Sequence, residues 1–115
     1  MTDKEILRDK RVRNAIKLNT NKELAKVDDL LKSETLEDLQ KIQSCLNKLT
    51  DYRERLSKLD SDILFSIADE TEADAESTDA AGFDDLILGA MSLLNARWQA
   101  IRSNQLASDL KDSSV

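Results

Sequence analysis

Eight leucine and isoleucine residues in the middle of the chain recur at spacings of three, four or seven positions, which places them on one face of an α-helix. They are Leu39, Ile42, Leu46, Leu49, Leu56, Leu59, Ile63 and Ile67. A helix of about 32 residues is roughly 50 Å long, and in water it needs a partner along its apolar face. Either the chain itself or a second molecule therefore has to supply another helix.

Composition excludes several other fold and function classes. The 115 residues include two Gly and no Pro, whereas β-sandwiches and barrels need frequent turn residues and phosphate-binding α/β folds need glycine-rich loops. With no His and the single Cys45, histidine-based catalysis, histidine-ligated zinc and an internal disulfide are excluded as well. We expect no catalytic residue, no metal site and no cofactor, and therefore no enzyme.

The periodicity predicts an all-α fold with a single domain over residues 1–107. We predict helices over about residues 3–31, 36–68 and 83–106. The first two form an antiparallel helical hairpin, and the third is amphipathic and packs across it. Thr35 and Asp38 resemble a capping box at the start of the second helix. The polar residues 18–21 lower helix propensity, which allows a kink or break there, and residues 108–115 are expected to fray.

Charge is distributed unevenly along the chain. Residues 1–26 carry eight basic and four acidic groups, whereas residues 69–85 carry eight acidic groups and no basic one. Residues 68–82 contain no large apolar side chain. We therefore predict a solvated acidic linker over residues 69–82, with a frayed acidic helix as the alternative.

Basic side chains in the first helix are candidate contacts for an anionic partner, either the phosphates of RNA or an anionic membrane surface. They are Arg8, Lys10, Arg11, Arg13 and Lys17. At helical spacing they spread over more than one side, so an ordinary solvated face is an alternative. A third possibility is that they pair with the acidic block of residues 69–85, within the chain or between chains.

Apolar side chains on the second and third helices are candidate interface residues. They are Leu46, Leu49, Leu56, Leu59, Ile63 and Trp98. Trp98 belongs to the face with which the third helix is predicted to dock, which comprises Phe83, Leu86, Ile87, Ala90, Leu94, Trp98 and Ile101. Both groups can form an internal core or bind another chain, the leucine stripe as a coiled coil. Tyr52 and Arg53 interrupt the stripe, which argues against a long uniform zipper.

Several short segments together carry a family resemblance. They are Arg8-Asp9-Lys10-Arg11-Val12-Arg13, Leu30-Leu31-Lys32, Leu46-Asn47-Lys48-Leu49, the run from Arg55 to Ile63, Asp69-Glu70-Thr71-Glu72 and Phe83-Asp84-Asp85-Leu86-Ile87. Over about residues 6–95 the chain resembles the amino-terminal helical region of Gag-like polyproteins from Bel/Pao-type LTR retrotransposons. The resemblance implies a structural role in particle assembly and no catalytic residues. Such polyproteins also contain zinc knuckles, a protease and a polymerase, and this chain has no Cys/His set for a knuckle.

These features lead to one expected function and one alternative. We expect a noncatalytic helical assembly module that self-associates as a homo-oligomer or docks another protein on its apolar helix faces. The alternative is an acidic regulatory binder or inhibitor that occupies a basic surface of a protein target. The chain has no stretch of about 18 apolar residues and no apolar signal segment, so we expect an intracellular, cytoplasmic protein.

Overall fold

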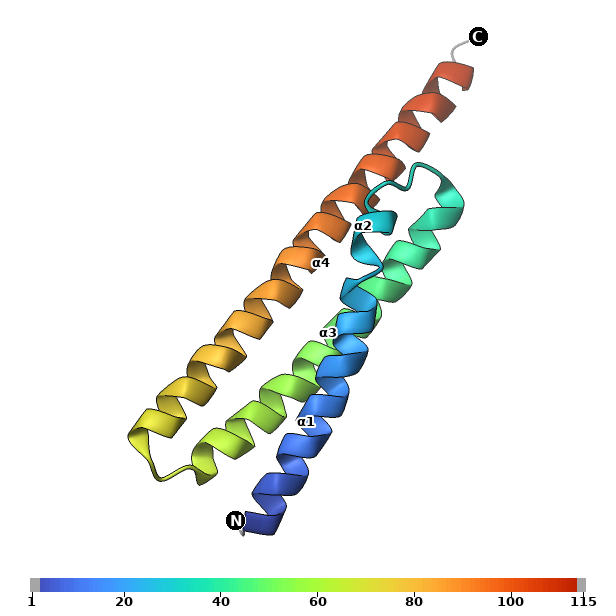
Figure 1. The fold of residues 1–115 in the computed structure, drawn as a ribbon. Coiled ribbons are helices and arrows are strands. Elements are labelled where there is room, and N and C mark those ends of the chain that lie inside the picture. The colour runs from blue at the N-terminus through green and yellow to red at the C-terminus, as the bar shows by residue number, and fades with distance from the viewer. Residues whose placement is uncertain (1–2, 114–115) are drawn as a thin grey trace.

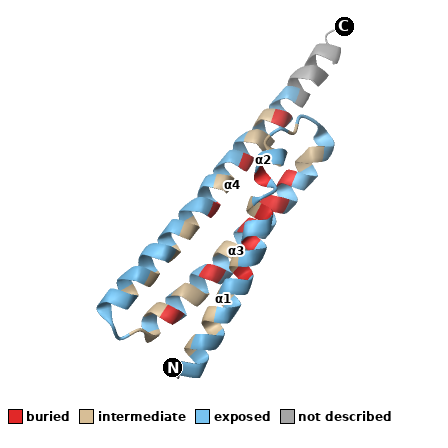
Figure 2. Cartoon of the chain, viewed as in Figure 1, coloured by how far each residue is buried: buried red, intermediate tan, exposed pale blue. Residues whose placement is uncertain are grey.

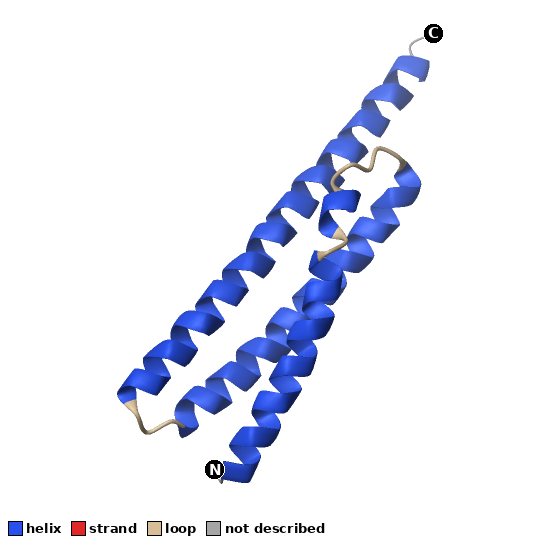
Figure 3. Cartoon of the chain, viewed as in Figure 1, coloured by secondary structure: helices blue, strands red, loops and turns tan. Residues whose placement is uncertain are grey.

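The computed structural model describes the backbone of residues 3–113 and the side chains of residues 3–104. It contains α1 (Asp3–Leu24), the single-turn α2 (Val27–Leu30), α3 (Leu36–Ser66) and α4 (Glu70–Ser113), and no strand within those residues (Figures 1 and 3). α1 and α4 run in the same direction, and α3 runs antiparallel to both (Figure 1). The bundle is a rod of 70 × 20 × 18 Å. The predicted all-α fold is confirmed.

α3 lies at the centre of the packing, because it contacts both α1 and α4 along much of its length. Its apolar stripe faces inward and forms one continuous core with residues of the neighbouring helices (Figure 2). The buried members of this core are Ile16, Val27, Ile42, Cys45, Leu46, Leu49, Leu56, Ile87, Leu94 and Ile101. The chain thus covers its own stripe, in the predicted helical hairpin with a third helix packed on it.

The predicted acidic linker over residues 69–82 is wrong. Only residues 67–69 connect the helices, and α4 begins at Glu70. The Asp69 carboxylate accepts hydrogen bonds from the backbone N–H groups of Thr71 (2.8 Å) and Glu72 (3.1 Å), which caps the helix. Acidic residues in the first turn favour the positive end of the helix dipole, and the interspersed alanines favour helix. These local effects stabilise a helix that has no large apolar residue in its first three turns.

The first helix ends earlier than predicted, and its break lies elsewhere. α1 continues through residues 18–21, where the buried Thr20 hydroxyl donates a hydrogen bond of 2.7 Å to the carbonyl of Ile16. The interruption falls at residues 25–26 and is followed by α2. Instead of competing with the helix, the Thr20 side chain is satisfied within it.

The second helix begins where predicted, with Thr35 as its N-cap. The Thr35 hydroxyl donates to the Asp38 carboxylate (2.8 Å) and makes no bond to a backbone N–H, so only part of the expected capping box forms. The third helix is longer than the predicted 83–106, since α4 extends through Ser113. The side chains of the predicted tail, residues 108–115, lie outside the described residues.

Candidate functional site

The candidate interface residues of α3 lie inside the bundle. Leu46, Leu49, Leu56 and Ile63 are buried, and Leu59 is partly buried against the same core. Trp98 of α4 also packs partly buried on this core. Of the two alternatives that the sequence leaves open for these four residues, the structure has the internal core, because α1 and α4 cover them.

Two of the five basic candidates form ion pairs with α4 instead of facing outward with the others. Lys10 Nζ lies 3.7 Å from carboxylate oxygens of both Glu72 and Glu76. Arg13 Nη1 lies 2.6 Å from Glu76 Oε2 and 3.2 Å from Asp60 Oδ1. This ionic cluster joins α1, α3 and α4, and it confirms the pairing of the basic helix with the acidic block within the chain.

The ionic cluster shifts the pKa of Arg13 and of Glu76. Burial lowers the pKa of Arg13, but hydrogen bonds to Glu76 and Asp60 outweigh burial and raise it overall. The hydrogen bond from Arg13 lowers the pKa of Glu76 against the opposing effect of burial. Both groups are thus held in their charged forms, which is the behaviour of a structural ion pair.

Of the remaining basic candidates, one contacts another helix and two are exposed to solvent. Lys17 Nζ lies 5.1 Å from the centre of the Phe83 ring in a cation–π contact. Arg8 and Arg11 are exposed, and Arg8 Nε lies 3.9 Å from its neighbour Asp9. The five side chains therefore do not form one surface for an anionic partner.

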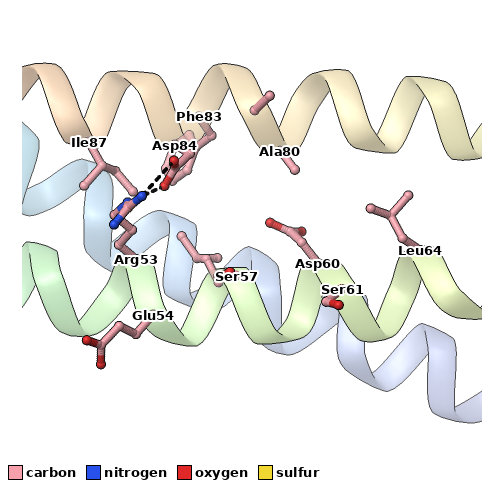
Figure 4. A pocket seen from close by; sticks show the side chains of 12 residues that line it. Arg53, Glu54, Ser57, Asp60, Ser61, Leu64, Ala80, Phe83, Asp84 and Ile87 are labelled. Carbon is pink, nitrogen blue, oxygen red and sulfur yellow. Dashed lines mark hydrogen bonds and ion pairs between the residues drawn. The ribbon is translucent and has the colours of Figure 1, made fainter.

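Some acidic residues of α4 form ion pairs within the bundle, and others are exposed to solvent. Glu72 and Glu76 face α1, and Asp84 forms a two-point contact with Arg53 of α3 at 2.6 and 3.3 Å (Figure 4). Glu70, Asp74, Asp79 and Asp85 are exposed. The acidic block thus stabilises the fold with part of its charge, which leaves fewer groups for a basic target.

A groove of about 530 Å³ lies between α3 and α4 (Figure 4). It exists because small side chains face each other there, among them Ser57, Ser61 and Ala80. Arg53 and Asp84 close one part of it and neutralise each other. Asp60 is paired to Arg13, and the further carboxylate in the lining, that of Glu54, belongs to an exposed residue.

Sequence reasoning missed a second ionic cluster, which is centred on Glu23. Its side chain is 6% exposed, and its carboxylate lies 3.0 Å from Lys26 Nζ and 3.1 Å from Lys48 Nζ of α3. Burial raises the pKa of Glu23, but the hydrogen bonds from both lysines outweigh burial and lower it overall. The sequence contains a signal for the burial of Glu23, because this residue lies at helical spacing from Ile16, Thr20 and Val27, which are buried.

Cys45 lies beside this cluster and lines a pocket of about 580 Å³ together with Glu23 and Lys48. Its buried thiol lies 3.8 Å from the Glu23 backbone carbonyl. Burial raises the pKa of the thiol, so the sulfur stays protonated and weakly nucleophilic. Ion pairs line much of this pocket, among them Lys26 with Glu23 and Lys41 with Asp38.

One face of α4 has no neighbour among the described residues of the bundle. Leu86 is 62% exposed and Leu93 is 55% exposed, one on each side of Gly89. A Cβ placed on Gly82 or on Gly89 would meet no atom within 4 Å, which shows open space along the same face. The exposed Ala96 extends it. We call Gly82, Leu86, Gly89, Leu93 and Ala96 the outer α4 face.

The outer α4 face corrects one further prediction. Leu86 was expected on the docking face of the third helix together with Ile87, but only Ile87 is buried. Leu86 lies about 100° from Ile87 around the helix, and in the observed rotation of α4 it points away from the core. The sequence signal for the outer α4 face is the alternating spacing of four and three residues between positions 82, 86, 89, 93 and 96.

Within the described part of the chain, no cluster of three or more His, Cys, Asp or Glu side chains could hold a metal ion. Likewise, none of the helices there combines the length and apolarity needed to cross a membrane. Comparison with known proteins finds no matching family model, curated protein or solved structure.

Proposed function

We propose that this chain is a noncatalytic helical interaction module that docks another protein helix on the outer α4 face. One observation carries the proposal: α4 has two apolar stripes, and the bundle covers only one of them. Phe83, Ile87 and Leu94 pack inward, while Leu86 and Leu93 remain in water. A helix that is apolar on both sides is typically covered on both sides.

Covering the outer α4 face would bury two exposed leucine side chains, and this burial contributes favourable free energy of binding. Fully burying a leucine is worth about 1.5–3 kcal/mol, and each of these leucines has more than half of its surface left to bury. Gly82 and Gly89 carry no side chain, so a partner backbone can approach α4 closely beside the leucines. Leucines flanked by small residues form knobs and holes for a docked helix.

The resemblance to Gag-like polyproteins fits the same proposal. A structural protein of a particle needs surfaces that join one copy to the next, and the outer α4 face is a surface of that kind. The exposed acidic groups that would serve the alternative, binding to a basic target, include Asp74 and Asp85. Asp85 borders the outer α4 face beside Leu86, whereas Leu86 and Leu93 supply most of the exposed apolar surface there, so we take the apolar face as the stronger candidate.

Site-specific photocrosslinking in cells that express the protein natively tests this proposal. A photoreactive side chain is placed at position 86 or 93, with position 7 as the matched control, since Leu7 is 50% exposed on α1. We expect several-fold more crosslinked protein from positions 86 and 93 than from position 7, whether the product contains a second copy or another protein. Equal yields at all three positions would contradict docking on the outer α4 face.

A further inference from the structure

α1 has an exposed surface that the ionic cluster does not use. Leu7 is 50% exposed and Leu18 is 65% exposed. The two leucines are eleven residues apart, which is about three helical turns, so both project from the same side of α1. Single exposed leucines are common on protein surfaces, so the charges around these two decide whether the surface has a partner.

Four basic side chains share this side of the helix with the leucines. Lys4, Arg8, Arg11 and Lys22 all project within about 100° of Leu7, and all four are exposed. The surface therefore combines apolar and cationic side chains along most of the length of α1. We call Lys4, Leu7, Arg8, Arg11, Leu18 and Lys22 the outer α1 face.

Most acidic side chains of α1 are turned away from the outer α1 face. Glu5 and Asp9 each lie two residues from Leu7, which is about 200° around the helix. Glu23 is buried. Among the described residues of α1, Asp3 is the one acidic group that borders the face, at its amino-terminal end. The outer α1 face is thus cationic although the whole chain has a net charge of −6.

The outer α1 face also points away from the acidic segment of α4. Arg13 lies two residues after Arg11, on the opposite side of the helix, and its Nη1 lies 2.6 Å from Glu76 Oε2 of α4. Lys10 lies two residues after Arg8 and contacts the same carboxylate at 3.7 Å. One set of basic residues thus stabilises the bundle, and the other set faces water.

We propose that the outer α1 face binds the surface of an anionic lipid bilayer, with α1 lying in the plane of that surface. The inference is independent of docking on the outer α4 face. The basic side chains contact the lipid phosphates, and Leu7 and Leu18 insert between the headgroups. The aliphatic parts of the Lys and Arg side chains extend the apolar contact, while their charged ends stay at the headgroups.

Two observations favour lipid over other anionic partners. Between Leu7 and Leu18 the same side of α1 carries Arg11 and Asn14, so the leucines lack the spacings of three and four residues that a docked protein helix needs. A fluid bilayer surface needs no such spacing. In addition, α1 has no aromatic side chain on which a nucleic acid base could stack.

Binding is expected to be weak and strongly dependent on salt. Each basic side chain near an anionic surface strengthens binding about fivefold, whereas the net negative charge of the rest of the chain opposes it. The range of these interactions falls from about 10 Å at 0.1 M salt to about 3 Å at 1 M. The fraction of protein bound to anionic vesicles should therefore fall steeply as salt is added.

Flotation of the full chain with lipid vesicles tests the proposal. Vesicles that contain phosphatidylserine as the anionic component are compared with vesicles of phosphatidylcholine alone. At low salt we expect the protein to float with the anionic vesicles and not with the neutral ones. Flotation with neither kind, or equally with both, would overturn the proposal.

A matched pair of charge reversals tests which surface binds. Arg8→Glu combined with Arg11→Glu should weaken vesicle binding about tenfold or more, because two contributions of about fivefold are lost. Lys32→Glu combined with Lys58→Glu is the control, since it reverses two exposed lysines outside α1 and lowers the net charge by the same amount. Circular dichroism checks that both variants fold. Equal losses would show that binding follows net charge, which would overturn the outer α1 face as the site.

Leu18 distinguishes a bilayer from a nucleic acid. Leu18→Cys, in a chain that also carries Cys45→Ala, is labelled with a fluorophore that brightens in apolar surroundings. Ser92→Cys, at an exposed position of α4, is the labelled control. Anionic vesicles should raise the emission several-fold at position 18 and leave it unchanged at position 92. Tighter binding to single-stranded RNA than to vesicles, without a change of emission at position 18, would overturn the choice of lipid.

Discussion

The inner stripe of α3 and the outer face of α4 resemble each other as sequence patterns but differ in their surroundings. Both follow spacings of three, four and seven residues, although the outer α4 face contains only two leucines, yet Leu49 is fully buried and Leu93 is 55% exposed. α3 has a helix on each side, whereas the outer face of α4 has no helix beside it among the residues that the structure describes. Periodicity therefore identifies a face that favours burial, and the arrangement of the other helices decides whether it is buried.

Polar contacts select which face of α4 turns inward. Glu76 reaches Arg13, Phe83 lies under Lys17, and Asp84 pairs with Arg53. These three α4 residues lie on the side of the helix that carries Ile87, so their partners fix the rotation of α4. A mutation can therefore test the core, the polar contacts that orient α4, or the outer face separately.

The largest expected effect is in the α3 stripe. Leu49→Ala should lower the free energy of unfolding by about 2–5 kcal/mol, because it leaves a cavity in a fully buried site. Urea denaturation followed by circular dichroism measures this change. Leu93→Ala is the matched control, with an expected change within about 0.5 kcal/mol at a protein concentration where the chain is monomeric. Equal losses for the two variants would remove the distinction between the two stripes.

The next effect concerns the ionic cluster that orients α4. Arg13→Gln should lower the free energy of unfolding by about 2 kcal/mol, because it leaves the partly buried carboxylates of Glu76 and Asp60 without their shared partner. Arg8→Gln, on an exposed side chain of the same helix, should change it by less than about 0.5 kcal/mol. A double-mutant cycle with Glu76→Gln measures the coupling, and additive losses would contradict a direct contact.

The Glu23 cluster predicts a loss of stability in acid. The pKa of Glu23 is lowered from its ordinary value of 4.5 in the folded protein, so its contribution to stability is fully present above pH 4.5. That contribution is lost as the pH falls through the lower folded value. Unfolding free energies measured from pH 7 to pH 3 should therefore fall less steeply for Glu23→Gln than for the unaltered protein. Parallel curves would show that the carboxylate of Glu23 is not held by the lysines.

A smaller effect is expected where the acidic segment begins its helix. Asp69→Ala removes the oxygen that accepts from the N–H groups of Thr71 and Glu72, and it should cost about 1 kcal/mol. Hydrogen exchange should become faster in the first turn of α4 and stay unchanged near Leu94. Asp74→Ala is the control, because Asp74 lies beyond the orphan N–H groups of that turn. Unchanged exchange after Asp69→Ala would contradict the cap.

The smallest expected effect on stability comes from the outer α4 face. Leu93→Glu should change the free energy of unfolding of the monomer by about 0.5 kcal/mol or less, because the position is exposed. The same substitution should abolish docking, since it places a charge at the centre of an apolar contact. Leu7→Glu should leave both properties unchanged. Circular dichroism and light scattering on the same samples separate stability from assembly.

Local signals in the chain were sufficient for much of the fold. The stripe of α3, the N-cap at Thr35 and the all-α class all follow from spacing and from side-chain hydrogen bonding over a few residues. The helix at residues 70–82 was also within reach of local reasoning, through the Asp69 cap and the alanines. An acidic helix is the alternative to the predicted linker over these residues, and helix propensity and capping favour it although the segment lacks large apolar residues.

The sequence alone determined that this chain is helical, that its longest apolar stripe had to be covered, and that its basic start and acidic segment could attract each other. Only the tertiary structure decided that α1 and α4 cover the stripe, that Lys10 and Arg13 are used inside the chain, and that Leu86 and Leu93 face outward. The physical reason is the range of the interactions. Propensity and capping act within a turn or two, whereas helix rotation depends on contacts such as Arg13 with Glu76, which are 63 residues apart in the chain.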